Sequence, residues 1–80
     1  MTDEYLAFCI AYDWAAVFEY LKMPCDEAFN LAMKLVAIAR REWRSELYYD
    51  NFMEWLEFNF FFGSFEKMKQ RLKARGLIEE

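Results

Sequence analysis

The chain has 80 residues, of which 58% are hydrophobic and 21% aromatic, and its formal net charge at pH 7 is −4. A chain this short forms one domain, residues 1–80, and buries only a little over ~60% of the surface that its unfolded form exposes, so some of its seventeen aromatic side chains should face a partner. The lack of histidine and the presence of only two glycines exclude Ser-His or Cys-His catalytic pairs and a glycine-rich phosphate-binding loop.

The first predicted helix starts after Thr2, which can cap it, and ends near Lys22, before the only proline. Its apolar face consists of Leu6, Ile10, Trp14, Val17, Phe18 and Leu21. The opposite face carries the rings of Tyr5, Phe8 and Tyr12. A surface helix would normally carry charges there. We therefore expect this helix either to be sandwiched between other elements or to present the three rings to a partner.

The second predicted helix begins with Pro24, a residue suited to a first helical turn, and has the clearest amphipathic pattern in the sequence. Its apolar face consists of Ala28, Phe29, Ala32, Leu35, Val36, Ala39 and Trp43. The small alanines in this stripe allow another helix, such as the first, to approach closely. The polar face includes Arg40, Arg41 and Arg44. We expect Asp13, at the edge of the first helix's core face, to reach water or to pair with one of these arginines.

Residues 47–62 contain eight aromatic side chains and include the third predicted helix, which begins near residues 49–51. One apolar arc, expected to join the core, consists of Phe52, Met53, Leu56 and Phe60. A second stripe consists of Trp55, Phe58 and Phe62, and the residues between the two are Glu54, Glu57 and Phe61. Two apolar stripes on one short helix predict two different contacts.

The fourth predicted helix spans residues 65–75, after a corner formed by Gly63 and Ser64, and Gly76 ends it. Its inward side carries Phe65, Met68 and Leu72. Leu77 and Ile78 are expected to fold back onto the other helices. Because no alternating strand pattern outweighs the helical one, the sequence predicts an all-α fold, a small bundle of three to four helices.

Charged residues alternate in blocks: residues 1–30 and 45–66 are acidic, and residues 31–44 and 67–75 are basic. Blocks of opposite sign suit helices that pair within a bundle. The last basic block also fits the electrostatic footprint of a nucleic-acid-binding helix. Its cations are Lys67, Lys69, Arg71, Lys73 and Arg75. A DNA-binding regulator that uses residues 65–75 is therefore an alternative, although the acidic net charge favours pairing within the bundle.

The sequence predicts a protein that is not an enzyme and has no cofactor and no metal site. Cys9 and Cys25 lack the spacing of a zinc motif, and we expect both to be buried or idle thiols. Glu54 and Glu57 share a helical face beside aromatic residues, but a di-iron bundle needs Glu-x-x-His motifs, which this chain lacks. A solvated acidic face is therefore the preferred interpretation of these two carboxylates.

The sequence predicts neither a secretory signal nor a membrane-spanning segment. Residues 1–4 carry acids where a secretory signal carries Lys or Arg, and the longest apolar run, residues 5–12, is too short to span a membrane. We therefore expect a cytoplasmic protein with no membrane contact.

The leading functional hypothesis is a small protein-interaction module. Aromatic anchors rimmed by carboxylates fit a basic target, because rings supply affinity while carboxylates orient the partner. The predicted partner-binding residues are Tyr5, Phe8, Tyr12, Asp50, Glu54, Trp55, Glu57, Phe58 and Phe61. A narrower version is an acidic inhibitor, of the kind that mobile elements encode, which covers the nucleic-acid-binding surface of a host-defence nuclease. A further alternative is a homo-oligomer, such as a dimer, that buries the spare aromatic stripe between copies.

Overall fold

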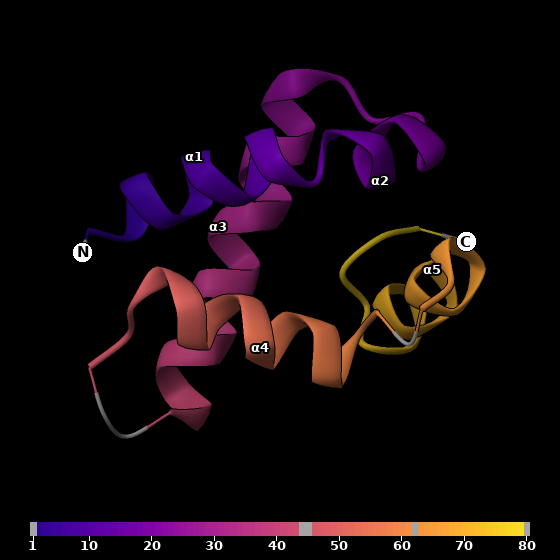
Figure 1. Ribbon diagram of the computed structural model, residues 1–80. Helices are drawn as coiled ribbons and strands as arrows, with labels where there is room; N and C mark the ends of the chain where they lie inside the picture. The colour runs from indigo at the N-terminus through magenta and orange to yellow at the C-terminus, as the bar shows by residue number, and fades with distance from the viewer. Residues whose placement is uncertain (1, 44–45, 62, 80) are drawn as a thin grey trace.

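The computed structural model describes residues 2–43, 46–61 and 63–79, and within these ranges it contains five α-helices and no strand (Figure 1). They are α1 (Asp3–Asp13), α2 (Ala15–Tyr20), α3 (Cys25–Glu42), α4 (Tyr49–Asn59) and α5 (Phe65–Ala74). The predicted all-α fold is confirmed. The helix count exceeds the expected three to four because the first predicted helix is divided at Trp14 into α1 and α2.

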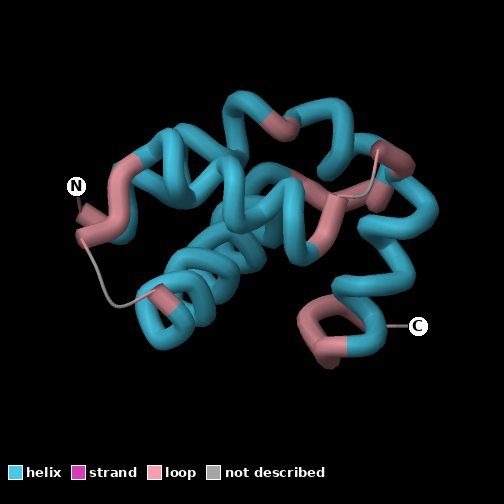
Figure 2. The backbone as a smooth tube through the Cα atoms, turned by 60° about the horizontal axis from the view of Figure 1, so that its bottom comes forward, coloured by secondary structure: helices cyan, strands magenta, loops and turns pink. Residues whose placement is uncertain are grey.

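Helix α3 is the central element of the bundle. It contacts both α1 and α4, and α1 also contacts α4. In Figure 1, α3 runs from the top of the molecule to the bottom and crosses α1 in its upper part and α4 in its lower part, and α5 lies beyond the end of α4. Figure 2 shows, from a second direction, that short loops join the helices. This arrangement leaves the outer sides of α1 and α4 facing away from α3.

The apolar face of α3 forms the centre of the core. Ala32, Leu35, Val36 and Ala39 have no exposed surface, in agreement with the amphipathic pattern. The two alanines allow close approach of α1, which is the principal neighbour of α3. The other large contributions to the core come from Leu6, Ile10, Trp14, Val17, Phe18, Phe52, Trp55, Leu56, Phe60, Met68 and Leu72. Leu77 and Ile78 pack against this core, as predicted.

The division of the first predicted helix occurs at Trp14, whose backbone (φ −103°, ψ 29°) departs from helical geometry. No proline or glycine marks this position in the sequence. The Trp14 side chain is buried, and its ring packs against Phe61 with 5.9 Å between the ring centroids. The break therefore coincides with a tertiary contact that helical periodicity does not encode.

The helix ends follow the signals read from the sequence. Thr2 caps α1 and Ser64 caps α5, since each side-chain oxygen accepts a hydrogen bond from the backbone N–H three residues later, at 3.2 and 3.3 Å. Helix α4 begins at Tyr49, within the predicted range. Two residues assigned to predicted helix faces, Arg44 and Phe62, lie outside the described residues.

The turn between α2 and α3 holds Lys22 in the left-handed backbone region, with φ 58°. The Lys22 N–H bonds the carbonyl of Glu19 at 2.9 Å, and the Met23 N–H bonds the carbonyl of Phe18 at 3.0 Å. This pair of bonds is the Schellman pattern that ends many helices. Glycine is the usual residue at this position, because it lacks the Cβ that makes the left-handed region unfavourable. Lys22 therefore carries backbone strain at the entrance to α3.

The substitution Lys22→Gly is expected to stabilise the protein by about 0.5 to 1 kcal/mol, because relief of the left-handed strain outweighs the greater freedom of glycine in the unfolded chain. Urea unfolding measures this change. Lys22→Ala is the matched control, since it removes the charge and keeps the Cβ, and it should lie within about 0.5 kcal/mol of the wild type. If the glycine variant were no more stable than the alanine variant, backbone strain at this turn would be ruled out.

Candidate functional site

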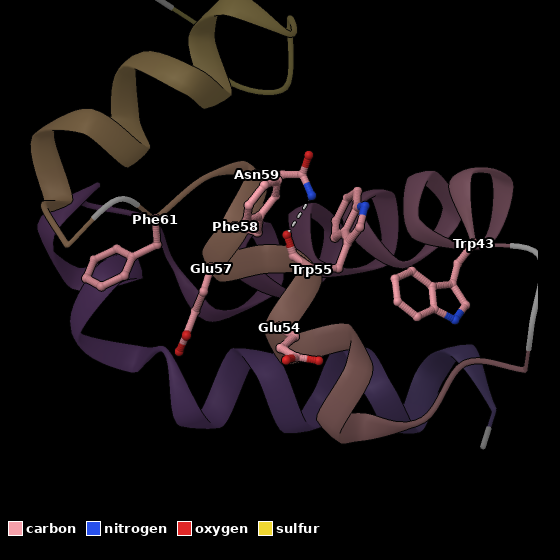
Figure 3. Close-up of a pocket in the computed structure, with 7 residues that line it drawn as sticks. All are labelled: Trp43, Glu54, Trp55, Glu57, Phe58, Asn59 and Phe61. Carbon is pink, nitrogen blue, oxygen red and sulfur yellow. Dashed lines mark hydrogen bonds between the residues drawn. The ribbon is translucent and has the colours of Figure 1, made fainter.

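A shallow groove with a volume of about 620 Å³ follows the outer face of α4. Its walls are Trp43, Glu54, Trp55, Glu57, Phe58, Asn59 and Phe61. Of these, the residues predicted to bind a partner are Glu54, Trp55, Glu57, Phe58 and Phe61. Figure 3 shows Trp43 near one end of the groove, Phe61 near the other, and the α4 residues between them. The structure therefore gathers most of the predicted α4 residues in one place, and adds Trp43 and Asn59.

The two aromatic residues assigned to one outward stripe of α4 separate in the structure. Phe58 is 79% exposed, whereas Trp55 is only 6% exposed. The Trp55 ring packs against Phe52 and Phe60, with centroid distances of 6.2 and 5.5 Å. Trp55 is therefore a core residue at the edge of the groove and not the exposed docking ring that the sequence predicted. Side chains three positions apart on an α-helix differ in direction by about 60°, which is enough to place one in the core and the other in solvent.

Phe61 closes one end of the groove. It is half-buried, and its ring lies 5.9 Å from that of Trp14 and 5.8 Å from that of Phe65. Phe65 was expected to face inward but remains 39% exposed, and it also packs against Tyr20 at 5.5 Å. These rings form a row of adjacent aromatic contacts that runs from the buried Trp14 to the exposed Phe65 and Tyr20. Phe58 is not part of it and projects from α4 into solvent.

A polar network ties α4 to α3 and α5. Glu42, at the end of α3, accepts a hydrogen bond from Trp55 Nε1 at 3.0 Å and another from Arg75 Nη2 at 3.1 Å. The Arg75 guanidinium carbon also lies 5.6 Å from the centroid of the Phe60 ring. Within α4, the Asn59 amide donates to the Trp55 carbonyl at 2.8 Å, the dashed bond in Figure 3. Of these bonds, the one from Trp55 to Glu42 joins α4 to α3 and holds the Trp55 side of α4 toward the core.

The start of α4 is attached to the end of α1. The Tyr49 hydroxyl donates a short hydrogen bond to the Asp13 carboxylate. This bond, together with burial and nearby negative charge, raises the pKa of Tyr49 to about 12. Asp13 was expected to reach water or to pair with an arginine. It is exposed, but its bonded partner is this tyrosine, and the ion pair between the first and third helices is made by Asp3 and Arg40.

The charge of the groove is negative. Among the described residues, only Glu54 and Glu57 contribute charged side chains to its walls. Both are exposed, and neither forms a hydrogen bond or ion pair with any residue that the structure describes. Asp50 is also exposed and does not line the groove, but it lies one helical turn before Glu54 on the same side of α4. The groove thus joins an exposed ring to unpartnered carboxylates.

The rings predicted on the outer face of α1 form a second aromatic surface. Tyr5, Phe8 and Tyr12 are 50%, 65% and 77% exposed, and none of them lines the α4 groove. The predicted partner-binding residues are therefore divided between this α1 surface and the α4 groove. Seven aromatic side chains in the described part of the chain remain exposed, so the surplus of ring surface expected from the composition is present.

The cations of the alternative nucleic-acid site do not share one face of α5. A spacing of four residues places them along two sides of the helix. One side carries Lys67, Arg71 and Arg75, and the other carries Lys69 and Lys73. Arg75 is paired with Glu42. A hydrogen bond from the Tyr20 hydroxyl, with help from Lys69 and Lys73, lowers the pKa of Glu66. The basic block is thus divided and lies among acids of the same molecule.

A second hollow, of about 450 Å³, lies beside the turn between α2 and α3. Its charged lining residues are Lys22, Glu27, Lys34, Lys69 and Glu79. Ammonium groups and carboxylates are mixed in its walls, so its charge does not select one class of ligand.

Three further observations bear on function. Within the described residues, no group of three or more Cys, Asp or Glu side chains is placed to hold a metal ion. None of the described helices combines the length and apolar character needed to cross a lipid bilayer. A comparison with protein-family models, curated proteins and solved structures finds no match. The function is therefore inferred from the geometry and charge of the surfaces.

The raised pKa of Tyr49 predicts a loss of stability at alkaline pH. The unfolded chain ionises this tyrosine near pH 10, whereas the folded protein keeps it protonated up to about pH 12. The contribution of its hydrogen bond is therefore complete below about pH 10 and is lost as the pH rises toward about 12. Tyr49→Phe should lower the free energy of unfolding by about 1 kcal/mol at pH 8. Urea unfolding of both proteins at pH 8 and pH 11 should show this difference shrinking, and a constant difference would contradict the shift.

The different burial of Trp55 and Phe58 predicts different effects on folding. Trp55→Ala should destabilise the protein by about 3 kcal/mol or more, because it empties a core site and removes a partner of Glu42. Phe58→Ala should change the stability by no more than about 0.5 kcal/mol. Thermal unfolding of the two variants makes this comparison. Equal destabilisation would contradict the assigned burial, and the expected result makes Phe58 the suitable position for binding studies.

Proposed function

We propose that the protein is a small, non-catalytic interaction module that binds the basic surface of another protein through the α4 groove. The observation that carries this proposal is the position of Phe58, an exposed ring that shares a groove with Glu54 and Glu57, and no described Lys or Arg contributes to this groove. Exposed aromatic surface with a polar rim is typical of protein interaction sites.

The energetics of the groove favour a protein partner. Full burial of a phenylalanine ring contributes roughly 1.5 to 3 kcal/mol of hydrophobic free energy. A few anchors of this kind often dominate the affinity of an interface. Exposed carboxylates such as Glu54 and Glu57 add little affinity while they remain in water. They do accelerate and orient the encounter with a positively charged surface. The ring therefore supplies affinity, and the two acids supply the preference for a basic partner.

A more specific form of the proposal is an inhibitor that covers a nucleic-acid-binding surface, such as that of a host-defence nuclease. These surfaces use Lys and Arg side chains to hold phosphate groups. Asp50, Glu54 and Glu57 lie along one side of α4 and present a row of negative charges that can take the place of phosphates. The net charge of −4 on an 80-residue chain supports this form.

Nucleic-acid binding by α5 and self-association are the alternatives. Nucleic-acid binding by α5 is less favoured than protein binding through the groove, because the α5 cations lie on two sides of the helix and Arg75 is paired with Glu42. Self-association would cover the exposed rings of α1 without a second kind of protein. Binding of duplex DNA that weakens steeply with added salt would favour the first alternative, and a stable dimer by light scattering would favour the second.

Affinity capture from the cells that express the protein tests the proposal with a pair of matched variants. The α4 variant combines Glu54→Gln, Glu57→Gln and Phe58→Ala. The control combines Glu4→Gln, Phe8→Ala and Glu19→Gln, which makes the same chemical changes at exposed positions of α1 and α2. Wild type and control should capture a protein with a basic surface that the α4 variant loses. Binding of the purified partner should weaken at least tenfold in the α4 variant, since burial of one phenylalanine exceeds the ~1.4 kcal/mol that a factor of ten requires.

The opposite pattern would contradict the proposal. If the control variant lost the partner and the α4 variant retained it, the α1 surface would be the binding site. If the captured partner had an acidic surface, the preference assigned to Glu54 and Glu57 would be wrong. Circular dichroism of both variants must show wild-type helix content, so that a loss of capture reports on the surface and not on folding.

A further inference from the structure

The protein contains an internal example of arginine recognition next to the groove. The Arg75 guanidinium is bonded to the Glu42 carboxylate at 3.1 Å and lies 5.6 Å from the centroid of the Phe60 ring. A carboxylate and a ring face both attract a cation, and the planar guanidinium can use both at once. The same Glu42 accepts the indole N–H of Trp55, one of the groove walls. Helix α4 thus already contributes to the binding of one arginine of its own chain.

The outer face of α4 offers the same pair of groups without an arginine from the described chain. Glu54 and Phe58 are four residues apart, and residues at this spacing are neighbours on a helix surface, with Cβ atoms about 5 to 6 Å apart. Glu57 and Phe61 repeat the spacing. Figure 3 shows the carboxylates of Glu54 and Glu57 on α4 between Phe61 and Trp43. Neither carboxylate bonds to another described residue, so both are available to a partner.

From this correspondence we propose that the groove binds an arginine side chain of the partner, stacked on Phe58 and hydrogen-bonded by Glu54 and Glu57. The inference rests on the proposed function and names the residue that the groove recognises on a basic surface. A guanidinium is planar and weakly hydrated, so it can stack on a ring while it donates two parallel hydrogen bonds to a carboxylate. A lysine ammonium is compact and strongly hydrated, and it lacks this paired geometry.

The walls of the groove favour the same choice. Trp43 and Trp55 bring largely apolar surface to the site. Apolar walls exclude water from part of the ligand, and a weakly hydrated cation loses less on entering such a site than a strongly hydrated one. Cation–π attraction is worth about 0.5 to 1 kcal/mol at exposed sites, which corresponds to a preference of roughly twofold to fivefold for the better-stacked cation.

Two defined peptides test the inference on the full chain. One is an acetylated, amidated peptide in which Arg alternates with Gly, and the other carries Lys in place of each Arg. Titrations followed by NMR use the indole N–H signals of Trp43 and Trp55 and the backbone signals of residues 54–61 as local reporters. The Arg peptide should bind roughly twofold to fivefold more tightly than the Lys peptide, with shifts confined to the groove. The double variant Glu54→Gln/Glu57→Gln should weaken both peptides.

Phe58→Leu is the decisive variant, because it keeps an apolar side chain and removes the ring. It should lower the affinity for the Arg peptide to that for the Lys peptide and leave the latter nearly unchanged. The matched control is Phe8→Leu on α1, which should preserve the difference between the peptides. Both phenylalanines are exposed, so neither variant is expected to unfold the protein.

The outcomes separate this inference from the proposed function. Equal affinity of the wild type for the two peptides would overturn arginine recognition, while loss of the captured partner in the α4 variant would still support the interaction module. Shifts centred outside residues 54–61, or a preference for Arg that survives Phe58→Leu, would also overturn the inference. If neither peptide bound and the α4 variant still captured the partner, both proposals would fail.

Discussion

The close packing of α1 on α3 is the constraint on which the rest of the structure depends. Ala32 and Ala39 of α3 and Leu6 and Ile10 of α1 are all fully buried, and small residues such as these alanines allow two helices to approach closely. Helix α4 occupies the remaining side of the same centre. A helix that packs in this way buries one face, and its opposite face must meet solvent unless another layer covers it. In the described part of this chain no further layer covers the outer face of α1, so its aromatic rings remain exposed.

The orientation of α4 is set by polar contacts as much as by packing. Tyr49 bonds to Asp13 at the start of the helix, and Trp55 bonds to Glu42 near its middle. A buried indole N–H without a partner would cost free energy, so the bond to Glu42 favours the rotation that places Trp55 inward. That rotation directs Phe58 outward, into the groove that Glu54 and Glu57 also line. The anchoring of one aromatic residue in the core thus determines the exposure of the next.

The same chemical pairing occurs on both sides of α4. On one side, a ring and a carboxylate hold Arg75 and join α5 to the bundle. On the other, rings and carboxylates line an open groove with no cation contributed by a described residue. We propose that the pairing that stabilises the fold around Arg75 serves as a binding surface in the groove, where no described residue supplies the arginine. This relation connects the packing of the helix to the proposed recognition of a basic partner.

The sequence by itself determined the helical fold, the caps at Thr2 and Ser64 and the buried stripe of α3, because these features follow from local spacing and from one clear apolar face. The exposure of the α1 rings was left open by the sequence, because periodicity does not show whether another element covers that face. The tertiary structure alone decided the break at Trp14, the partner of Asp13 and the separation of Trp55 from Phe58. Helix α4 carries aromatic residues in two stripes, so periodicity permits more than one rotation of it about its axis. Contacts with residues far away in the chain, Asp13 and Glu42, select one of them.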